Sequence, residues 1–382
     1  MTLFRSAATM TSAGPHLQGP TLQVLPVAVA ANVRRVQART DARIMAVVKA
    51  DGYGHGAIAV AQAAVAAGAE QLGVTDIAEG SALRAAGLTV PILAWLHPSG
   101  IDAARAAADR IDVAVASVDE LRQLIVDAGP LGDPAIRVHL NVDTGMARGG
   151  CPSEHWEELF RLARAGHGLG RIDVVALMGH LPLADYADPA QNAAAVLRME
   201  AAVAAAHASG LERLLVHLAA TSGALTDRAT HFDMVRIGAG LVGIDPSGTI
   251  ALNGASRLTA PIVHTAQASR GTPVGYGGFH VTDRDTHLSV IGLGYADGIP
   301  RGLSANAAVE IGGRRHRIVG RVSMDQIVID TGAEAFPHGT VATVFGPDGG
   351  AVPSIHEWAD WAATIPHTIV AGIGPRVKRS TT

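Results

Sequence analysis

The stretch IMAVVKADGYGHG, residues 44–56, joins an apolar run to a glycine-rich turn, with Lys49 at the junction. A short apolar run that ends in such a turn is typical of a strand buried on both faces. Glycine lets the backbone of the turn adopt conformations that other residues avoid and approach a ligand closely. The stretch therefore predicts a buried strand whose carboxyl end carries a lysine.

Seven further runs of this kind follow, separated by alanine-rich segments that favour helix. Together with 44–48, the runs are 71–74, 91–96, 113–116, 136–142, 174–178, 214–217 and 234–238, and the segments between them include 57–67, 76–86, 117–128, 153–165 and 190–209. Strands that alternate with helices form a parallel sheet with crossover helices. Eight repeats predict an α/β fold, a (β/α)8 TIM-type barrel. An open doubly wound sheet is the alternative.

The pattern changes after about residue 253, where the helical segments stop. Short β-rich runs separated by Gly, Pro and Asp follow at 261–267, 287–291, 308–311, 317–322, 327–329 and 342–344. The first twenty residues are small, polar and interrupted by Pro and Gly. We therefore predict a loose N-terminal extension at 1–20, a barrel domain at 21–253 and a C-terminal all-β domain at 254–382.

The composition excludes several classes of partner. Charged residues make up 17%, apolar residues 48%, and the formal net charge is −4. No block of Lys and Arg is present, so we expect neither nucleic acid nor an anionic membrane as a partner. No apolar run reaches the length of about 18 residues that a membrane span needs.

The single cysteine, Cys151, excludes an internal disulfide framework and a cysteine-rich zinc site. No histidine pair has the spacing of metal ligands, so we expect no catalytic metal. Residues 22–30 resemble a weak signal peptide, but Gln23 and Pro26 interrupt them. We therefore expect a cytoplasmic protein.

Lysine is scarce, since only Lys49 and Lys378 occur among 30 basic residues. A lysine at the carboxyl end of a barrel strand is partly desolvated, which favours the neutral amine. Such an amine can form a Schiff base with an aldehyde cofactor. Lys378 lies in a charged terminal tail, where we expect it to be solvated. The structural alternative for Lys49 is a strand-end side chain that reaches for water.

Glycines 238, 240 and 243 form a G-x-G-x-x-G pattern after the last predicted barrel strand. No acidic residue stands near 263, where a dinucleotide fingerprint would need one. Backbone N–H groups that hold a single phosphate are therefore favoured, because the loops after strands 7 and 8 of such barrels often bind phosphate. The absence of a G-K-[ST] loop and a G-x-S-x-G elbow argues against nucleotide hydrolysis and serine hydrolases.

Other polar motifs also fall at predicted strand ends or in turns, where ordinary turn polarity is the alternative for each. Taken together and in order, the motifs resemble those of the alanine racemase family, pyridoxal 5′-phosphate (PLP) enzymes of fold type III. They are AVVKADGYGHG at 46–56, NVDTGMARGG at 141–150, GH at 179–180, HLAAT at 217–221, VRIGAGLVG at 235–243, GYG at 275–277, GYADGIPR at 294–301 and GRVSMDQ at 320–326.

This resemblance implies a barrel that carries PLP and a β domain that completes the site of a partner subunit in a head-to-tail homodimer. It also implies the interconversion of L-alanine and D-alanine, which supplies D-alanine for peptidoglycan. By motif, Lys49 would be the Schiff-base lysine and the base for one face of the substrate Cα, and Tyr276 of the partner subunit the base for the other. Racemisation needs two such groups, because the proton leaves one face and returns on the other.

The resemblance also implies the remaining site residues. Arg236, supported by His180, would hydrogen-bond the pyridine nitrogen, and since a guanidinium keeps its proton, the ring nitrogen would stay unprotonated and favour racemisation over transamination. The phosphate would be held by Tyr53, Thr221, Gly238 and Ala239. Arg148 would contact the PLP oxygen and the substrate carboxylate, which would also meet the Met324 N–H of the partner subunit. The entrance would be lined by Asn141, Tyr295, Arg301, Arg321 and Asp325.

Two residues depart from the family pattern. Asn141 replaces a carbamylated lysine that supports Arg148 in many members, so we expect an amide hydrogen bond there instead. Ala220 replaces a common asparagine. A broad-specificity amino-acid racemase of the same fold therefore remains an alternative. A fold type III decarboxylase, a zinc-dependent D-serine dehydratase and a non-catalytic PLP-binding barrel fit the motifs less well.

Overall fold

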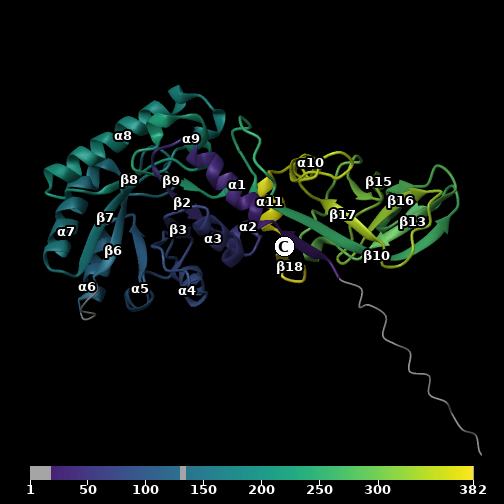
Figure 1. The fold of residues 1–382 in the computed structure, drawn as a ribbon, viewed down its shortest axis with the longest axis horizontal. Coiled ribbons are helices and arrows are strands. Elements are labelled where there is room, and N and C mark those ends of the chain that lie inside the picture. The colour runs from purple at the N-terminus through teal and green to yellow at the C-terminus, as the bar shows by residue number, and fades with distance from the viewer. Residues whose placement is uncertain (1–18, 130–134, 382) are drawn as a thin grey trace, which may run out of the picture.

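The computed structural model describes residues 19–129 and 135–381, and these form two β structures that lie side by side, as Figure 1 shows. Helices surround the first, which is parallel, and the second is almost entirely antiparallel. All but the last two residues of the predicted extension at 1–20 lie outside the described residues. The predicted α/β barrel followed by a β domain is confirmed.

The barrel sheet contains eight parallel strands in the order β8-β7-β6-β5-β4-β3-β2-β9. The strands are β2 (Arg43–Val47), β3 (Gln71–Val74), β4 (Ile92–Ala94), β5 (Ile111–Val115), β6 (Ile136–Asn141), β7 (Ile172–Met178), β8 (Leu215–His217) and β9 (Met234–Ile237). The two end strands approach each other through backbone bonds from Asp233 N to Val216 O and from Arg236 N to Ala219 O, both 3.0 Å. The sheet therefore nearly closes, which excludes the open doubly wound alternative.

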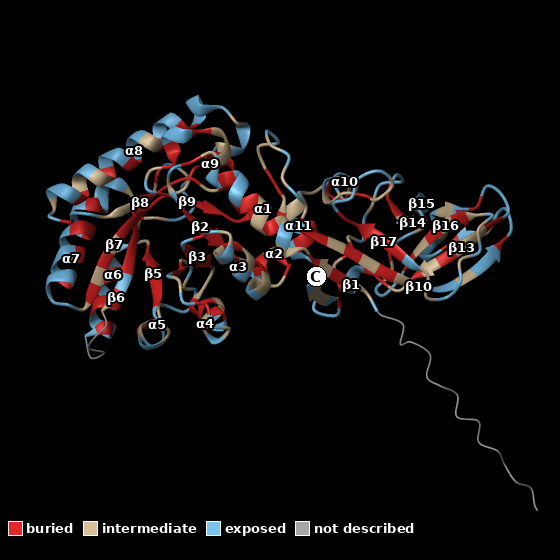
Figure 2. Ribbon diagram, in the orientation of Figure 1, coloured by how far each residue is buried: buried red, intermediate tan, exposed pale blue. Residues whose placement is uncertain are grey.

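The helices that cover the barrel bury their apolar stripes against it, as the red faces in Figure 2 show. In α6, for example, Leu121, Leu124, Ile125 and Ala128 are buried at helical spacing, and Ser117 caps the helix N-terminus. The helices are α1 (Pro26–Gln37), α2 (Lys49–Tyr53), α3 (Ala57–Ala66), α4 (Ile77–Ala85), α5 (Ala103–Asp109), α6 (Val118–Ala128), α7 (Trp156–Gly168), α8 (Pro189–Ala208) and α9 (Thr221–Thr226).

The second domain is built around the long strand β10, which pairs with β17 along its first half and with β13 along its second. The remaining ladders run β13-β16-β15-β14-β17, so these six strands close on themselves. The strands of this domain are β10 (Ser256–Ala268), β11 (Pro273–Val274), β12 (His280–Val281), β13 (Thr286–Ile291), β14 (Ala308–Ile311), β15 (Arg314–Ile318), β16 (Ile327–Gly332), β17 (Val341–Phe345) and β18 (Lys378–Thr381).

Two features of the second domain differ from the sequence expectation. It contains the short helices α10 (Ile355–Trp361) and α11 (Pro366–Ala371). A capping box between Ser354 and Glu357 starts α10, and this S-x-x-E spacing is a helix signal in the sequence. In addition, β1 (Thr21–Val24) pairs with β10 and β18, so these residues lie in the second sheet. The domain boundaries at 20 and 253 stay predictions.

The two domains meet beside α2, where α11 packs against it. Gly54 lies so close to α11 that a Cβ atom would stand 2.1 Å from Val370 O. The Arg379 guanidinium donates to Gly54 O over 3.1 and 3.2 Å. The turn that follows Lys49 is therefore held by both domains.

Candidate active site

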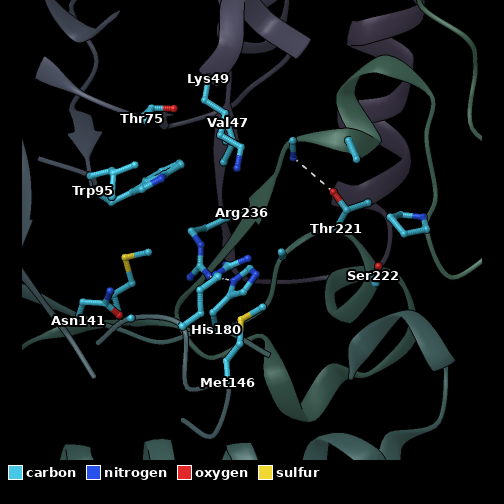
Figure 3. Close-up of a pocket in the computed structure, with 18 of the residues that line it drawn as sticks. Val47, Lys49, Thr75, Trp95, Asn141, Met146, His180, Thr221, Ser222 and Arg236 are labelled. Atoms are coloured by element: carbon cyan, nitrogen blue, oxygen red, sulfur yellow. Dashed lines mark hydrogen bonds between the residues drawn. The ribbon is translucent and has the colours of Figure 1, made fainter. Parts of the chain in front are cut away.

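The carboxyl ends of the barrel strands surround a cavity of about 660 Å³. It is lined by every barrel residue that was predicted for the site: Lys49, Tyr53, Asn141, Arg148, His180, Thr221, Arg236, Gly238 and Ala239. In the view of Figure 3, Trp95 and Asn141 lie on one side, Thr221 and Ser222 on the other, and Arg236 and His180 between them. Eight strands thus bring residues almost 200 positions apart in the sequence to one site.

Lys49 follows β2 after one intervening residue, Val48, and its amine lies 5.9 Å from the centre of the Trp95 ring. Burial lowers the pKa of this amine, and the charges of Arg148 and Arg236 lower it further, while Glu79 acts in the opposite direction. Desolvation and neighbouring cations both disfavour the ammonium form. The surroundings therefore increase the fraction of neutral, nucleophilic amine.

The chain turns left-handed immediately after Lys49. Ala50, Asp51 and Gly52 have φ and ψ values between 43° and 62°, and Tyr53 also has a positive φ. Each non-glycine residue in this conformation costs roughly 1–2 kcal/mol. Glu79 offsets this cost by accepting a hydrogen bond from Ala50 N at 2.8 Å, and the Asp51 carboxylate accepts one from Ala57 N at 2.9 Å. Such strain is common at functional sites, where the surrounding structure holds it.

Arg236 lies at the base of the cavity, almost fully buried. Its Nη1 donates to Nδ1 of His217 over 2.9 Å, and its Nη2 donates to Nδ1 of His180 over 3.0 Å. Both nitrogens also donate to backbone carbonyls, including Gly179 O at 2.8 Å. The Nε–H makes no hydrogen bond to the residues that the structure describes. One guanidinium donor is therefore left for a ligand.

The two histidines are neutral bases that fit this guanidinium. Burial, followed by the charge of Arg236, lowers the pKa of His180 to about 3 and that of His217 well below its usual value. Burial also lowers the pKa of Arg236, to about 10, which leaves it protonated at neutral pH. Each neutral imidazole can accept a hydrogen bond from the guanidinium at Nδ1. This arrangement fixes both tautomers and the orientation of Arg236.

The G-x-G-x-x-G stretch forms a tight backbone turn against Tyr53 and Thr221. Thr221 Oγ1 accepts hydrogen bonds from Gly238 N at 3.3 Å and Gly240 N at 3.2 Å. A Cβ at position 238 would stand 2.2 Å from the Tyr53 hydroxyl, so any larger residue there would displace the phenol. Ser222 instead donates to Asp185 over 2.5 Å. The turn therefore gathers a hydroxyl, a phenol and backbone N–H groups that suit a phosphate.

The loop after β6 presents Arg148 at the mouth of the cavity. Asp143 Oδ1 accepts hydrogen bonds from the backbone N–H groups of residues 145, 146 and 147 and so shapes this loop. The expected hydrogen bond between the Asn141 side-chain amide and Arg148 is not formed. Neither side chain makes a hydrogen bond to a described residue. Arg148 is exposed on the loop rather than held against the strand end, which is the physical reason for this difference.

The predicted site residues of the second domain do not line this cavity. They gather elsewhere, where η5 (Tyr276–Gly278), η6 (Tyr295–Asp297) and the loop at 320–326 lie together. Tyr295 N donates to Ser323 O over 3.0 Å, and the Arg321 guanidinium lies 3.7 Å from the centre of the Phe279 ring. Tyr276 is 69% exposed and Met324 53%. Arg301 and Asp325 are also exposed, and Asp325 pairs with Arg376 at 2.7 Å.

Comparison with protein families identifies both domains. The model of the alanine racemase N-terminal domain matches residues 26–246, and the model of the C-terminal domain matches residues 255–381. The chain belongs to the alanine racemase family. The predicted family and fold are confirmed by this match.

Relatives and solved structures agree with this membership. The chain is 41% identical over 359 residues to the alanine racemase of Beutenbergia cavernae, covering 92% of this chain and 95% of the relative. The alanine racemase structure from Streptomyces lavendulae has a TM-score of 0.91 at 34% identity, with 97% of this chain and 98% of that chain covered. The structure from Streptomyces coelicolor has the same score at 37% identity, with 95% and 98% covered. These relatives and structures confirm the predicted alanine racemase function.

Some residues of this alanine racemase site escaped the sequence analysis. Trp95 follows β4, so the strand-end rule alone indicates it. Asp185 lies in the loop after β7, and Glu79 is an ordinary helix residue by pattern. His367 lines the cavity from α11 of the second domain. No sequence pattern brings His367 to the barrel, because only the packing of the two domains does so.

Within residues 19–129 and 135–381, no helix is both long and apolar enough to cross a bilayer. No group of three or more His, Cys, Asp and Glu side chains in the same ranges is arranged to hold a metal ion.

Proposed function

We propose that this chain is a PLP-dependent alanine racemase that works as a head-to-tail homodimer, with Lys49 and Tyr276 of the partner subunit as the two bases. The observation that carries the proposal is the position of the Lys49 amine in one cavity with Arg236 and the Gly238 turn. A family structure from Bartonella henselae is described with covalently bound pyridoxal phosphate, at a TM-score of 0.84 and 26% identity over 96% of this chain and all of that one.

The residues of the cavity fit this cofactor. Tyr53, Thr221 and the N–H groups of Gly238 and Ala239 would hold the phosphate, because the missing Cβ at 238 lets the Tyr53 hydroxyl lie against this backbone beside Thr221 Oγ1. The remaining Nε–H of Arg236 would meet the pyridine nitrogen as a donor. Bound PLP supplies an electron sink that acidifies the α-hydrogen of the amino acid.

Lys49 would hold the cofactor aldehyde and then move the proton on one face of the substrate Cα. Burial and the neighbouring arginines favour its neutral amine, which is the form that both tasks need. The Arg148 guanidinium at the mouth of the cavity would bind the substrate carboxylate. Trp95 beside the amine would limit water on this side.

The second proton carrier would come from the partner subunit. Tyr276 and Met324 are exposed in this chain and lie away from its own Lys49 cavity. The backbone N–H of Met324 makes no hydrogen bond to a described residue, so it can reach a carboxylate. In a head-to-tail dimer, each exposed cluster of residues 276, 295, 301, 321, 324 and 325 would close the cavity of the other subunit.

The chemistry is tested in heavy water. Incubation with L-alanine should give D-alanine that carries deuterium at Cα, and purified protein should show the visible absorbance of bound PLP. The Lys49→Ala variant should lose that absorbance and the covalent link. Formation of pyruvate or an amine, or retained absorbance in the variant, would overturn the proposal. Parallel incubation with larger amino acids tests the broad-specificity alternative.

The dimer is tested by mixing two inactive variants. Lys49→Ala and Tyr276→Phe subunits, unfolded together and refolded, should form hybrid dimers in which one site has both bases. Random mixing should restore roughly a quarter of the wild-type activity, since half of the dimers are hybrids with one complete site of two. No recovery would contradict shared sites, and each variant refolded alone is the control.

We further propose a cytoplasmic location and a role in supplying D-alanine for peptidoglycan, as the family resemblance implies. Expression of the chain should allow a bacterium that lacks its own alanine racemases to grow without added D-alanine. Cell fractionation with a cytoplasmic marker enzyme tests the location. Growth that still needs D-alanine would contradict this role.

A further inference from the structure

A buried carboxylate lies among the barrel strands. Asp112, the second residue of β5, is only 3% exposed, and charged side chains are rarely buried so far unless they are paired. Arg137 of the neighbouring strand β6 donates to it from Nε, which lies 3.2 Å from each carboxylate oxygen. Gln71 of β3 donates to Oδ2 over 3.5 Å. An ionised carboxylate has about four acceptor sites, so Asp112 can accept a further hydrogen bond.

A row of two buried histidines connects Asp112 with Arg236. His139 of β6 has its Nε2 3.5 Å from Oδ2 of Asp112. Its Nδ1 lies 2.9 Å from Nε2 of His217, the last residue of β8. Nδ1 of His217 in turn lies 2.9 Å from Nη1 of Arg236 on β9. The row therefore runs from β5 through β6 and β8 to β9, and it ends at the guanidinium that lines the Lys49 cavity.

The guanidinium decides the direction of each hydrogen bond in this row. Arg236 can only donate, so Nδ1 of His217 accepts and the proton of this ring lies on Nε2. Nε2 therefore donates to Nδ1 of His139, whose own proton must also lie on Nε2. The reverse direction would leave the His217 ring without a proton, which an imidazole does not reach near neutral pH. The last N–H of the row thus faces Asp112 and makes no hydrogen bond to another described residue.

The interior around the row is apolar, which makes a missing partner costly. Met178 and Met45 are the register partners of His217 and Arg236 on the adjacent strands, and both belong to a buried apolar cluster. A polar network in such surroundings is stable only while each of its members is satisfied. Without an acceptor at its far end, the row would gain by moving the two imidazole protons to Nδ1. The His217 N–H would then face the guanidinium, donor against donor.

We propose that Asp112 and His139 are positioning residues for Arg236: they keep His217 an acceptor and so hold the free Nε–H of Arg236 toward the pyridine nitrogen. The inference rests on the proposed PLP-dependent function and deepens it. It assigns control of this donor to two residues that do not line the cavity. Such support fixes the orientation of a group that itself meets the cofactor.

The tautomers are tested in cofactor-free protein labelled with 15N in the histidine rings. Long-range 1H–15N correlation spectra should show His139 and His217 as neutral rings protonated at Nε2. His139→Phe and His217→Gln spectra identify the two sets of signals. In Asp112→Leu, protonation at Nδ1 should become populated in at least one of the two rings. A proton on Nδ1 of either ring in the wild-type protein would overturn the inference.

The effect on Arg236 is tested by comparing PLP with its 1-deaza analogue, in which carbon replaces the pyridine nitrogen. Both are titrated by fluorescence in the Lys49→Ala background, where no covalent link obscures the affinity. Asp112→Leu removes the acceptor, and the half-exposed Arg137 can turn to water. The variant should raise the Kd for PLP about 3- to 10-fold, the value of an ordinary hydrogen bond. The Kd for the analogue should stay unchanged, whereas a merely structural role would weaken both ligands alike.

Three further variants make the outcome decisive. Asp112→Asn keeps an acceptor oxygen and should bind PLP within about 2-fold of the parent. His139→Phe should repeat the effect of Asp112→Leu and replaces it if that variant fails to fold. Asp173→Leu is the matched control, because Asp173 also lies 3.5 Å from a histidine, His167, but in an exposed pair. It should change neither Kd.

The outcomes separate this inference from the function on which it rests. Equal losses for PLP and the analogue, or no loss for PLP in either variant that breaks the row, would overturn the positioning role. If the Lys49→Ala parent binds PLP no more tightly than the analogue, the proposed contact between Arg236 and the pyridine nitrogen fails instead.

Discussion

Glu79 accepts a hydrogen bond from the backbone N–H of Ala50, the residue after Lys49, with 2.8 Å between Oε1 and N. Its second oxygen accepts from Thr75 N over 2.7 Å. One carboxylate therefore joins the carboxyl ends of β2 and β3 and holds the left-handed turn that follows the lysine. Its charge also favours the ammonium form of Lys49. Glu79 thus acts on the position and on the proton affinity of the same amine.

The substitution Glu79→Gln should loosen this turn. An amide offers only one acceptor, so either Ala50 N–H or Thr75 N–H would face another donor and lose its bond. The expected loss is about 1–3 kcal/mol in the free energy of unfolding, together with at least about a 10-fold fall in kcat. Urea denaturation and steady-state kinetics measure the two effects.

Glu70→Gln is the matched control, because Glu70 forms only an exposed ion pair with Arg43 at 3.6 Å. Exposed pairs contribute little, so neither stability nor kcat should change measurably. A Glu79→Gln variant with normal stability and normal kcat would show that the turn needs no carboxylate. Lower stability with unchanged kcat would limit Glu79 to a structural role.

The scarcity of lysine allows the state of Lys49 to be observed directly. Protein labelled with 15N on the lysine side chain should give two Nζ resonances, from Lys49 and Lys378. We expect Lys49 to titrate below the usual lysine range in cofactor-free protein, since burial and Arg148 lower its pKa. The Lys49→Ala spectrum identifies the resonance, and Lys378 serves as the internal reference.

Substitution of Arg148 tests the direction in which neighbouring charges shift the pKa of Lys49. Arg148→Gln deletes a neighbouring cation and should raise the pKa of Lys49, whereas Glu79→Gln deletes a neighbouring anion and should lower it. The two variants should therefore move the midpoint in opposite directions. No shift in either variant would mean that burial alone controls the pKa of the amine.

The barrel and its site could be predicted from the sequence because each piece is local. The run at 44–48, the lysine after it and the glycines at 52, 54 and 56 are contiguous, and the strand-end rule places their side chains at one face. The same rule holds for Arg236 and His180. Recognition of the family motifs added which residues act together, which no single run indicates.

The parts that could not be predicted depend on packing between distant segments. The left-handed turn at residues 50–53 needs Glu79, 29 positions away from Ala50, to hold it. His367 reaches the barrel only because α11 lies against α2. The pairing of β1 with β10 joins residues 21–24 to 256–259, and a strand of four residues carries no sign of its sheet. A pattern within one segment holds no information on such contacts.

A buried histidine should make stability depend on pH. His55 Nδ1–H donates to Tyr53 O over 2.8 Å, Ser256 Oγ donates to its Nε2 over 2.9 Å, and burial lowers its pKa to about 4. Between about pH 6.5 and 4 the unfolded chain binds this proton and the folded chain does not, so stability falls as pH falls. His55→Asn should reduce that slope by about 1.4 kcal/mol per pH unit.

Urea unfolding of cofactor-free protein at several pH values between 7.5 and 4.5 measures the slope. Part of the pH dependence of stability should remain in the variant, because the pKa values of His180 and His217 are also lowered. His338→Asn, at an exposed position, is the control substitution. An unchanged slope in His55→Asn would mean that the folded protein accepts a proton at this position.

Tyr276→Phe should distinguish proton transfer on one face of the substrate Cα from proton transfer on the other. If Tyr276 of the partner subunit serves L-alanine and Lys49 serves D-alanine, the variant loses one proton carrier and keeps the other. Because Tyr276 is exposed in the single chain, the variant should fold normally, and an unchanged melting temperature checks that. Tyr186→Phe, at another exposed tyrosine, is the matched control.

The measurement must follow hydrogen exchange rather than steady-state rates. The two enantiomers have equal free energies, so kcat/KM in the two directions must stay equal in any variant. Exchange is free of this constraint. In heavy water, D-alanine should still acquire α-deuterium from Lys49 in the Tyr276→Phe variant, faster than it racemises, while L-alanine should stay unlabelled. Equal loss of exchange from both enantiomers would show that the phenol does not serve a single face.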